Sequence, residues 1–134
     1  MKGFGRLGWM IGWCVVGGWL LGGCEQSAKE EERRATGIKV EVLNGCKEPG
    51  IARKFARILR SKGFDVVNGD GANAENFGFL ETIVVDRSGD MAKAWKVAKL
   101  LRTKNCIQQV IADPYRVEEV TVVIGKDFRT LSVK

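Results

Sequence analysis

Residues 38–59, IKVEVLNGCKEPGIARKFARIL, contain the pattern that decides the fold. Residues 38–43 alternate apolar and polar side chains, which is typical of a half-buried β-strand. The Asn-Gly pair at 44–45 predicts a turn, and the Pro-Gly pair at 49–50 predicts the opening of a helix, because proline is tolerated in a first helical turn. The apolar residues that follow recur at helical spacing and predict one buried helix face. They are Ile51, Ala52, Phe55, Ala56, Ile58 and Leu59.

The downstream sequence continues this alternation of strands and helices. Residues 64–67 and 81–86 predict two strands, and the second is so continuously apolar that we expect it in the middle of the sheet. Residues 90–104 predict a second amphipathic helix, and residues 120–124 predict a last strand. The resulting order is that of the split βαβ arrangement. The sequence therefore predicts an α+β fold with an antiparallel sheet and two helices on one face.

The first 24 residues have the pattern of an export signal. Lys2 and Arg6 precede an apolar, glycine-rich run at 7–21, which is shorter than the roughly 20 apolar residues of a bilayer-spanning helix. The run ends in Leu-Gly-Gly-Cys at 21–24, which resembles a bacterial lipobox. We expect Cys24 to be lipidated and to become the new N-terminus, so that the chain is anchored to a membrane. The alternative is an ordinary membrane-anchoring helix with a chance cysteine.

A charged segment separates this signal from the folded domain, which we place at residues 38–134. Residues 25–37, EQSAKEEERRATG, contain no large apolar side chain, so we expect a solvated tether. Glu25 follows the lipobox cysteine, and its similarity to sorting signals favours the outer membrane in a Gram-negative host. The chain has a net charge of +6, and without Lys2 and Arg6 the charge is 20 − 16 = +4, which suits anionic envelope polymers or lipid head groups. Export argues against nucleic acid as a partner.

Several short motifs together resemble the LytR C-terminal domain. They are VEVLNG at 40–45 with PGIA at 49–52, KGFDV at 62–66, the middle positions Asn73, Ala74, Phe77, Thr82, Val84, Val85 and Arg87, and VTVVIG at 120–125 with Asp127 and Phe128. The resemblance covers residues 38–128 and implies an accessory cell-envelope module. In LytR-CpsA-Psr proteins, this module follows a catalytic domain that this chain does not resemble. Cys46 departs from the family pattern, where a small hydroxyl residue or glycine is common.

Two cysteines, Cys46 and Cys106, remain beyond the signal segment. In the split βαβ fold, the end of the first strand and the end of the second helix lie at one edge of the sheet. We therefore predict a disulfide between them, which an exported protein can keep. Two separate buried thiols are the alternative. Without histidine or a CxxC pair, we expect no metal site.

Both predicted helices carry basic outer faces. Arg53, Arg57 and Arg60 recur at helical spacing on the first, and Lys96 and Lys99 lie on the second. These five residues are candidates for binding an anionic wall polymer, and the alternative is an ordinary solvated face. Because both helices should cover one sheet face, we expect the two basic rows to merge.

Two further groups of residues have competing interpretations. Asn44, Asn68, Asn73 and Asn76 are suited to hydrogen-bonding sugar hydroxyls, although asparagine is also a common turn former. Trp95 lies near the apolar helix face, so we predict that it belongs to the core. An exposed Trp95 would instead be able to stack on a sugar.

Catalysis is difficult to assign to this sequence. It has no histidine, no paired carboxylates at a suggestive spacing and no phosphate-binding loop, so we predict a protein that is not an enzyme and uses no cofactor. Two hypotheses follow. The first is a lipid-anchored module that binds peptidoglycan or an attached polymer. The second is a scaffolding subunit that binds an envelope protein through its exposed sheet face or edge.

Overall fold

The structure is a computed structural model that describes residues 37–131. The expected lipidation at Cys24 and the signal and tether before residue 37 lie outside this part. Within the described residues, no helix has the length and hydropathy to cross a bilayer.

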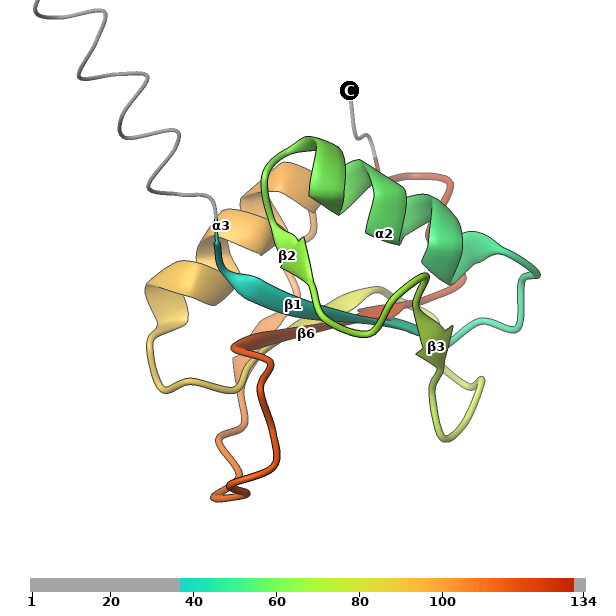
Figure 1. Cartoon of the computed structure of the whole chain (residues 1–134). Coiled ribbons are helices and arrows are strands. Elements are labelled where there is room, and N and C mark those ends of the chain that lie inside the picture. The colour runs from blue at the N-terminus through green and yellow to red at the C-terminus, as the bar shows by residue number, and fades with distance from the viewer. Residues whose placement is uncertain (1–36, 132–134) are drawn as a thin grey trace, which may run out of the picture. The chain divides into compact units, whose positions relative to one another are not determined.

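Two helices cover one face of a six-stranded mixed sheet (Figure 1), so the predicted α+β class is confirmed. The elements are β1 (Lys39–Asn44), α2 (Ile51–Ser61), β2 (Asp65–Val66), β3 (Ala72–Asn73), β4 (Ile83–Asp86), α3 (Met91–Leu101), β5 (Cys106–Gln108) and β6 (Val120–Ile124). β3 is a short strand between the two strands predicted at residues 64–67 and 81–86. α3 ends three residues before the predicted boundary, because Arg102 adopts a left-handed conformation with a φ of 57°.

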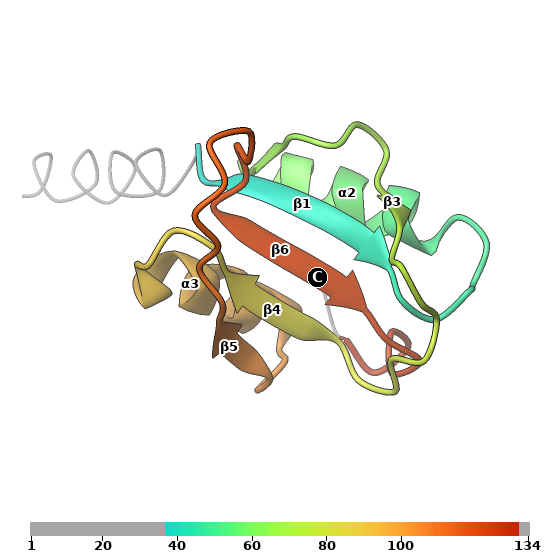
Figure 2. The same cartoon turned by 90° about the horizontal axis from the view of Figure 1, so that it is seen from below.

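The sheet differs from the expected antiparallel one. Its order is β2-β1-β6-β4-β5, with β3 beside the end of β1, and only the pair β4–β6 is antiparallel. Each helix returns the chain to the end of the sheet where the preceding strand began, so the next strand pairs in parallel beside it. The long segment 109–119 then reverses the chain, and β6 fills the middle of the sheet between β1 and β4 (Figure 2).

The hydrophobic core lies between the helices and the sheet. Strands β1, β4 and β6 contribute a layer of valines, and the helices contribute Phe55, Leu59, Val97 and Leu101 with four alanines around them. Phe64, Phe128 and Leu131 pack against the margin of this cluster. Every member of the cluster falls between residues 38 and 131, so the unit contains its own core and can be studied without the upstream segments.

A tight corner joins the start of β4 to the end of β6. The backbone N–H and the hydroxyl of Thr82 both donate to Asp127 Oδ1 at 2.8 Å, and the N–H of Gly125 donates to Thr82 Oγ1 at 3.0 Å. A Cβ atom on Gly125 would lie 2.3 Å from the carbonyl carbon of Glu81. Glycine is therefore required here by close backbone approach.

Replacing Gly125 by alanine should destabilise the domain. Because the added methyl group would meet backbone rather than a movable side chain, we expect Gly125→Ala to lower the free energy of unfolding by about 1–3 kcal/mol in urea denaturation. Gly78→Ala is the matched control, since the nearest atom to its added Cβ would be 3.6 Å away. Equal unfolding midpoints for the two variants would contradict this account of the corner.

Candidate functional site

The outer surface of the two helices is strongly basic. Neither α2 nor α3 contains an acidic residue. The helices lie side by side on the same face of the sheet, so their cations share one side of the molecule (Figure 1). These cations are Arg53, Lys54, Arg57 and Arg60 on α2 and Lys93, Lys96 and Lys99 on α3. This helical face, defined by those seven residues, is the main electrostatic feature of the domain.

Part of the α2 row is paired with a loop carboxylate. Asp70, in the segment after β2, lies 3.5 Å from Arg53 Nε and 3.6 Å from Arg60 Nη1. Arg60 also donates to the carbonyl of Gly69 and, at 3.5 Å, to that of Val66. The side chains of this ion pair network remain between two-fifths and three-fifths exposed, and such pairs contribute little stability. Arg53 and Arg60 therefore remain accessible to an external anion that competes with Asp70.

The cations of α3 have a different orientation. At 100° per residue, Lys96 and Lys99 lie opposite the buried stripe of the helix, so they point into solvent. Within residues 37–131, neither lysine makes an ion pair, and Arg57 makes none either. The α2 row instead leans over the outer edge of the sheet toward Asp70. Arg53 and Arg60 are thus engaged with Asp70, and the merging of the two rows stays a prediction.

Trp95 is exposed rather than part of the core, which corrects the prediction made from the sequence. Half of its surface, 51%, is accessible. The buried stripe of α3 is formed by Ala94, Val97, Ala98 and Leu101, and position 95 falls at its margin. Lys99 lies one turn further along the helix, so Trp95 presents an aromatic surface beside a cation.

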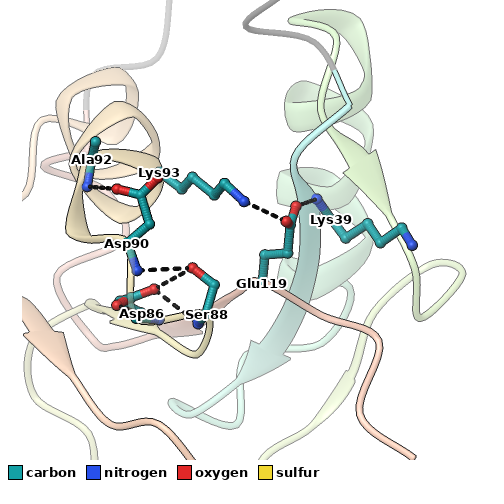
Figure 3. Close-up of polar contacts among 8 residues, drawn as sticks. Lys39, Asp86, Ser88, Asp90, Ala92, Lys93 and Glu119 are labelled. Atoms are coloured by element: carbon teal, nitrogen blue, oxygen red, sulfur yellow. Dashed lines mark hydrogen bonds and ion pairs between the residues drawn. The ribbon is translucent and has the colours of Figure 1, made fainter.

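Two carboxylates fix the N-terminus of α3 (Figure 3). Asp86 is fully buried, and its Oδ1 accepts hydrogen bonds from the N–H and hydroxyl of Ser88 at 3.0 and 2.9 Å. Burial alone would raise the pKa of Asp86, but hydrogen bonds from Gln108, Ser88 and Gly89 lower it overall. Asp90 then caps the helix by accepting from the N–H of Ala92 at 3.1 Å.

Glu119 ties α3 to the start of β1 (Figure 3). Its Oε1 lies 2.5 Å from Lys93 Nζ, and its Oε2 accepts from the backbone N–H of Lys39 at 3.1 Å. The hydrogen bond from Lys93 lowers the pKa of Glu119, and the same bond raises the pKa of Lys93. These contacts set the position of α3 and hence of its exposed cations.

Two of the asparagines considered as sugar ligands have structural roles. Asn68 Nδ2 donates to the carbonyl of Val42 at 2.8 Å, and its Oδ1 accepts from the N–H of the same residue at 3.1 Å. Its side chain therefore pairs with β1 as a strand residue would. Asn44 Nδ2 donates to the carbonyl of Glu48 at 2.8 Å and its Oδ1 accepts from the N–H of Cys46 at 3.1 Å. Both side chains stabilise loops, as asparagine often does.

The structure leaves Cys46 and Cys106 as free thiols, so the expected disulfide is absent from it. Both residues lie at the same edge of the sheet, as predicted, but β6 and β4 separate them. Three interstrand spacings place them about 14 Å apart, beyond the roughly 7 Å limit between Cα atoms of a disulfide. Each packs at the margin of the core, and burial raises the pKa of the Cys106 thiol.

Metal-binding side chains do not gather in the described part of the chain, where no group of three His, Cys, Asp or Glu residues is suited to an ion.

Residues 37–128 match the family model described as "LytR cell envelope-related transcriptional attenuator". Neither the curated proteins nor the solved structures gave a match.

The ion pair that positions α3 should give a pH-dependent stability. Because the fold lowers the pKa of Glu119 from its ordinary 4.5, the ionised carboxylate stabilises the fold above that pH. This contribution is lost as the pH falls through the lowered pKa. We expect Glu119→Gln to reduce the free energy of unfolding by about 0.5–1 kcal/mol at pH 7, with a smaller difference from wild type below pH 4.5. Urea denaturation across pH 3–7 measures this difference.

The matched control is Glu75→Gln, because Glu75 is exposed and makes no ion pair with another described residue. A pH-independent loss of stability in Glu119→Gln would mean that the carboxylate acts through packing rather than charge.

Proposed function

The chain belongs to the LytR C-terminal family of cell-envelope-related domains, and from this premise we propose that it is a lipid-anchored module that binds an anionic glycan polymer through its helical face. Peptidoglycan and the polymers attached to it are the ligands that this chemistry fits. The observation that carries the proposal is the pair of acid-free helices on one face of the sheet, with Arg57, Lys96 and Lys99 exposed to solvent and Trp95 exposed one turn before Lys99.

The charge pattern suits a polymer better than a single small anion. Lys96 and Lys99 are neighbours on one helix surface, with about 5–6 Å between Cβ atoms. Arg57 and the pair Arg53–Arg60 continue the positive surface on α2. Each exposed charge contact contributes only about 0.2–1 kcal/mol, so useful affinity requires several contacts along one ligand. A polymer with carboxylates or phosphates at intervals supplies them.

Trp95 adds selectivity for a polymer that contains sugar rings. An exposed tryptophan offers a large flat apolar surface, and the C–H face of a pyranose can pack on it while its hydroxyls stay in water. Lys99 on the next turn would contact a carboxylate or phosphate of the same residue. A polyanion without sugar rings would contact the lysines alone, whereas an anionic glycan would contact both the lysines and Trp95.

The helical face is held ready for binding by the rest of the fold. The Asp90 cap and the Lys93–Glu119 pair fix α3 on the sheet. Arg53 and Arg60 are drawn toward Asp70, which resembles the anionic group of a ligand. A surface that is already ordered loses less conformational entropy on binding.

Anchoring would keep this domain at the cell envelope. We propose that Cys24 carries the lipid and that residues 25–36 connect it to the domain. Firm attachment needs two or three acyl chains, since one holds a protein only marginally. In a Gram-negative host, Glu25 favours the outer membrane, with the domain facing the periplasm.

The alternative function is binding of an envelope protein by the sheet face that lacks helices (Figure 2). Phe77 and Leu80, which precede β4, favour this alternative because both expose apolar surface.

Binding to purified sacculi should depend on the lysines of α3. Residues 37–134 contain Trp95 as their only tryptophan, so its fluorescence reports ligand contact while sedimentation reports binding. We expect wild type to bind, with affinity that falls as salt is added. Lys96→Ala combined with Lys99→Ala should weaken binding roughly tenfold. Soluble glycan fragments should change the emission of Trp95.

The matched control removes two lysines elsewhere, Lys39→Ala with Lys126→Ala, and should bind within about twofold of wild type. If this control loses as much affinity as the α3 variant, net charge rather than the helical face determines binding. Absence of binding at low salt would contradict the polymer proposal and favour the protein-binding alternative.

A further inference from the structure

The segment between β5 and β6 exposes an unusual amount of apolar surface. Five large apolar side chains lie within residues 107–117, and they are Ile107 (48% exposed), Val110 (54%), Ile111 (47%), Tyr115 (90%) and Val117 (59%). Single exposed apolar residues need no explanation, but five within eleven consecutive residues are a concentration that requires one. We call residues 107–117 the apolar segment.

The apolar segment crosses the end of the sheet at which the described chain begins. It leaves the sheet beside the end of β4, where the N–H of Gln109 donates to the carbonyl of Asp86 at 2.9 Å. It returns beside the start of β1, where the N–H of Glu119 donates to the carbonyl of Lys39 at 2.9 Å. Figures 1 and 2 both show the segment at this end of the sheet. Gly37, the first described residue, is therefore close to it in the fold.

The length of the upstream chain limits how far this end can lie from a lipid on Cys24. Twelve residues, 25–36, separate Cys24 from Gly37. A chain of that length spans at most about 45 Å even when fully extended. A lipid-anchored domain would therefore hold its apolar segment at a high effective concentration near the bilayer surface, which favours even a weak contact.

We propose that the apolar segment inserts into the interface of the phospholipid bilayer that holds the lipid anchor. This inference rests on the proposed anchoring at Cys24. Tyr115 suits the headgroup region because its ring is apolar and its hydroxyl is polar. Val110, Ile111 and Val117 would supply aliphatic contacts to the acyl boundary. The domain would then have a fixed orientation, with one end on the membrane.

The charges of the segment point to a contact driven by apolar surface. Arg116 Nη1 lies 2.9 Å from Glu118 Oε1, and Arg116 Nε lies 4.0 Å from Asp113 Oδ2. The only cation of the segment is thus paired with carboxylates, so attraction to anionic lipids is not expected. Asp113 Oδ1 also accepts from the N–H of Tyr115 at 2.9 Å, which shapes the turn that presents the tyrosine. Salt should leave this contact unchanged, unlike binding at the helical face.

The test uses the full lipidated protein on neutral phosphatidylcholine vesicles, with bromine on the acyl chains as a quencher. Tyr115→Trp in a Trp95→Phe background places the tryptophan reporter in the segment. Cleavage of the signal peptide before Cys24 would remove Trp9, Trp13 and Trp19. We expect bromolipid to quench the Tyr115→Trp reporter at least about twofold more than it quenches Trp95 in wild type. Added salt should not change this quenching, and adding Ile111→Asp with Val117→Asp should abolish it.

Three outcomes would overturn the inference. Quenching no stronger than that of Trp95, in protein that floats with the vesicles, would contradict the membrane contact and leave the anchor intact. Blue-shifted emission without quenching, together with a dimer mass, would assign the segment to a second copy of the chain. If the protein did not float with the vesicles, it would carry no lipid anchor, and the inference, which rests on that anchor, would fail.

Discussion

The domain depends on burying the apolar face of each helix against one layer of valines in the sheet. Val40, Val42, Val84, Val120 and Val122 form this layer on the helix-facing side of the sheet, and none has accessible surface. Leu59, Leu101 and the small residues around them fill the space above it. Because both stripes must face the same valines, both helices occupy the same side, and their polar surfaces are turned outward together. The basic helical face and the sheet face without helices are therefore consequences of a single packing constraint.

Local pattern was sufficient to predict much of this arrangement. The alternation at 38–43, the helical spacing from Ile51 to Leu59 and the amphipathic pattern from residue 90 correctly indicated strands, helices and the α+β class. Strand pairing was not predictable in the same way. The insertion of β6 between β1 and β4 depends on contacts across some 80 residues, and no local signal specifies it. The separation of Cys46 from Cys106 follows from that insertion.

The basic residues of the site were identified from the sequence, but their partners and neighbours were not. Helical spacing placed Arg53, Arg57 and Arg60 on one side of α2. It could not show that Asp70 lies between two of them, because Asp70 belongs to a loop whose course depends on β2 and β3. Trp95 was assigned to the core because it lies near the apolar face of the helix. Its exposure follows from helix geometry, because each residue advances about 100° around the axis and position 95 therefore falls beside the buried stripe.

The fold has two exposed surfaces that would bind their ligands by different interactions. The helical face offers separated cations and one aromatic ring, so its contacts are electrostatic and weaken with salt. The apolar segment offers aliphatic and aromatic groups with internally paired charges, so its contacts are insensitive to salt. They occupy different parts of the domain, so the polymer contact and the membrane contact that we propose would not compete for the same residues.

The central claim is that the helical face is the ligand surface. Solution NMR of residues 37–134 during titration with soluble anionic glycan fragments tests it most directly, because each backbone amide and the single indole N–H report separately. The account predicts shifts along the outer surface of α2 and α3 and at the Trp95 indole, with little change in β1 and β6. Shifts confined to the sheet face without helices, or none at saturating ligand, would contradict it.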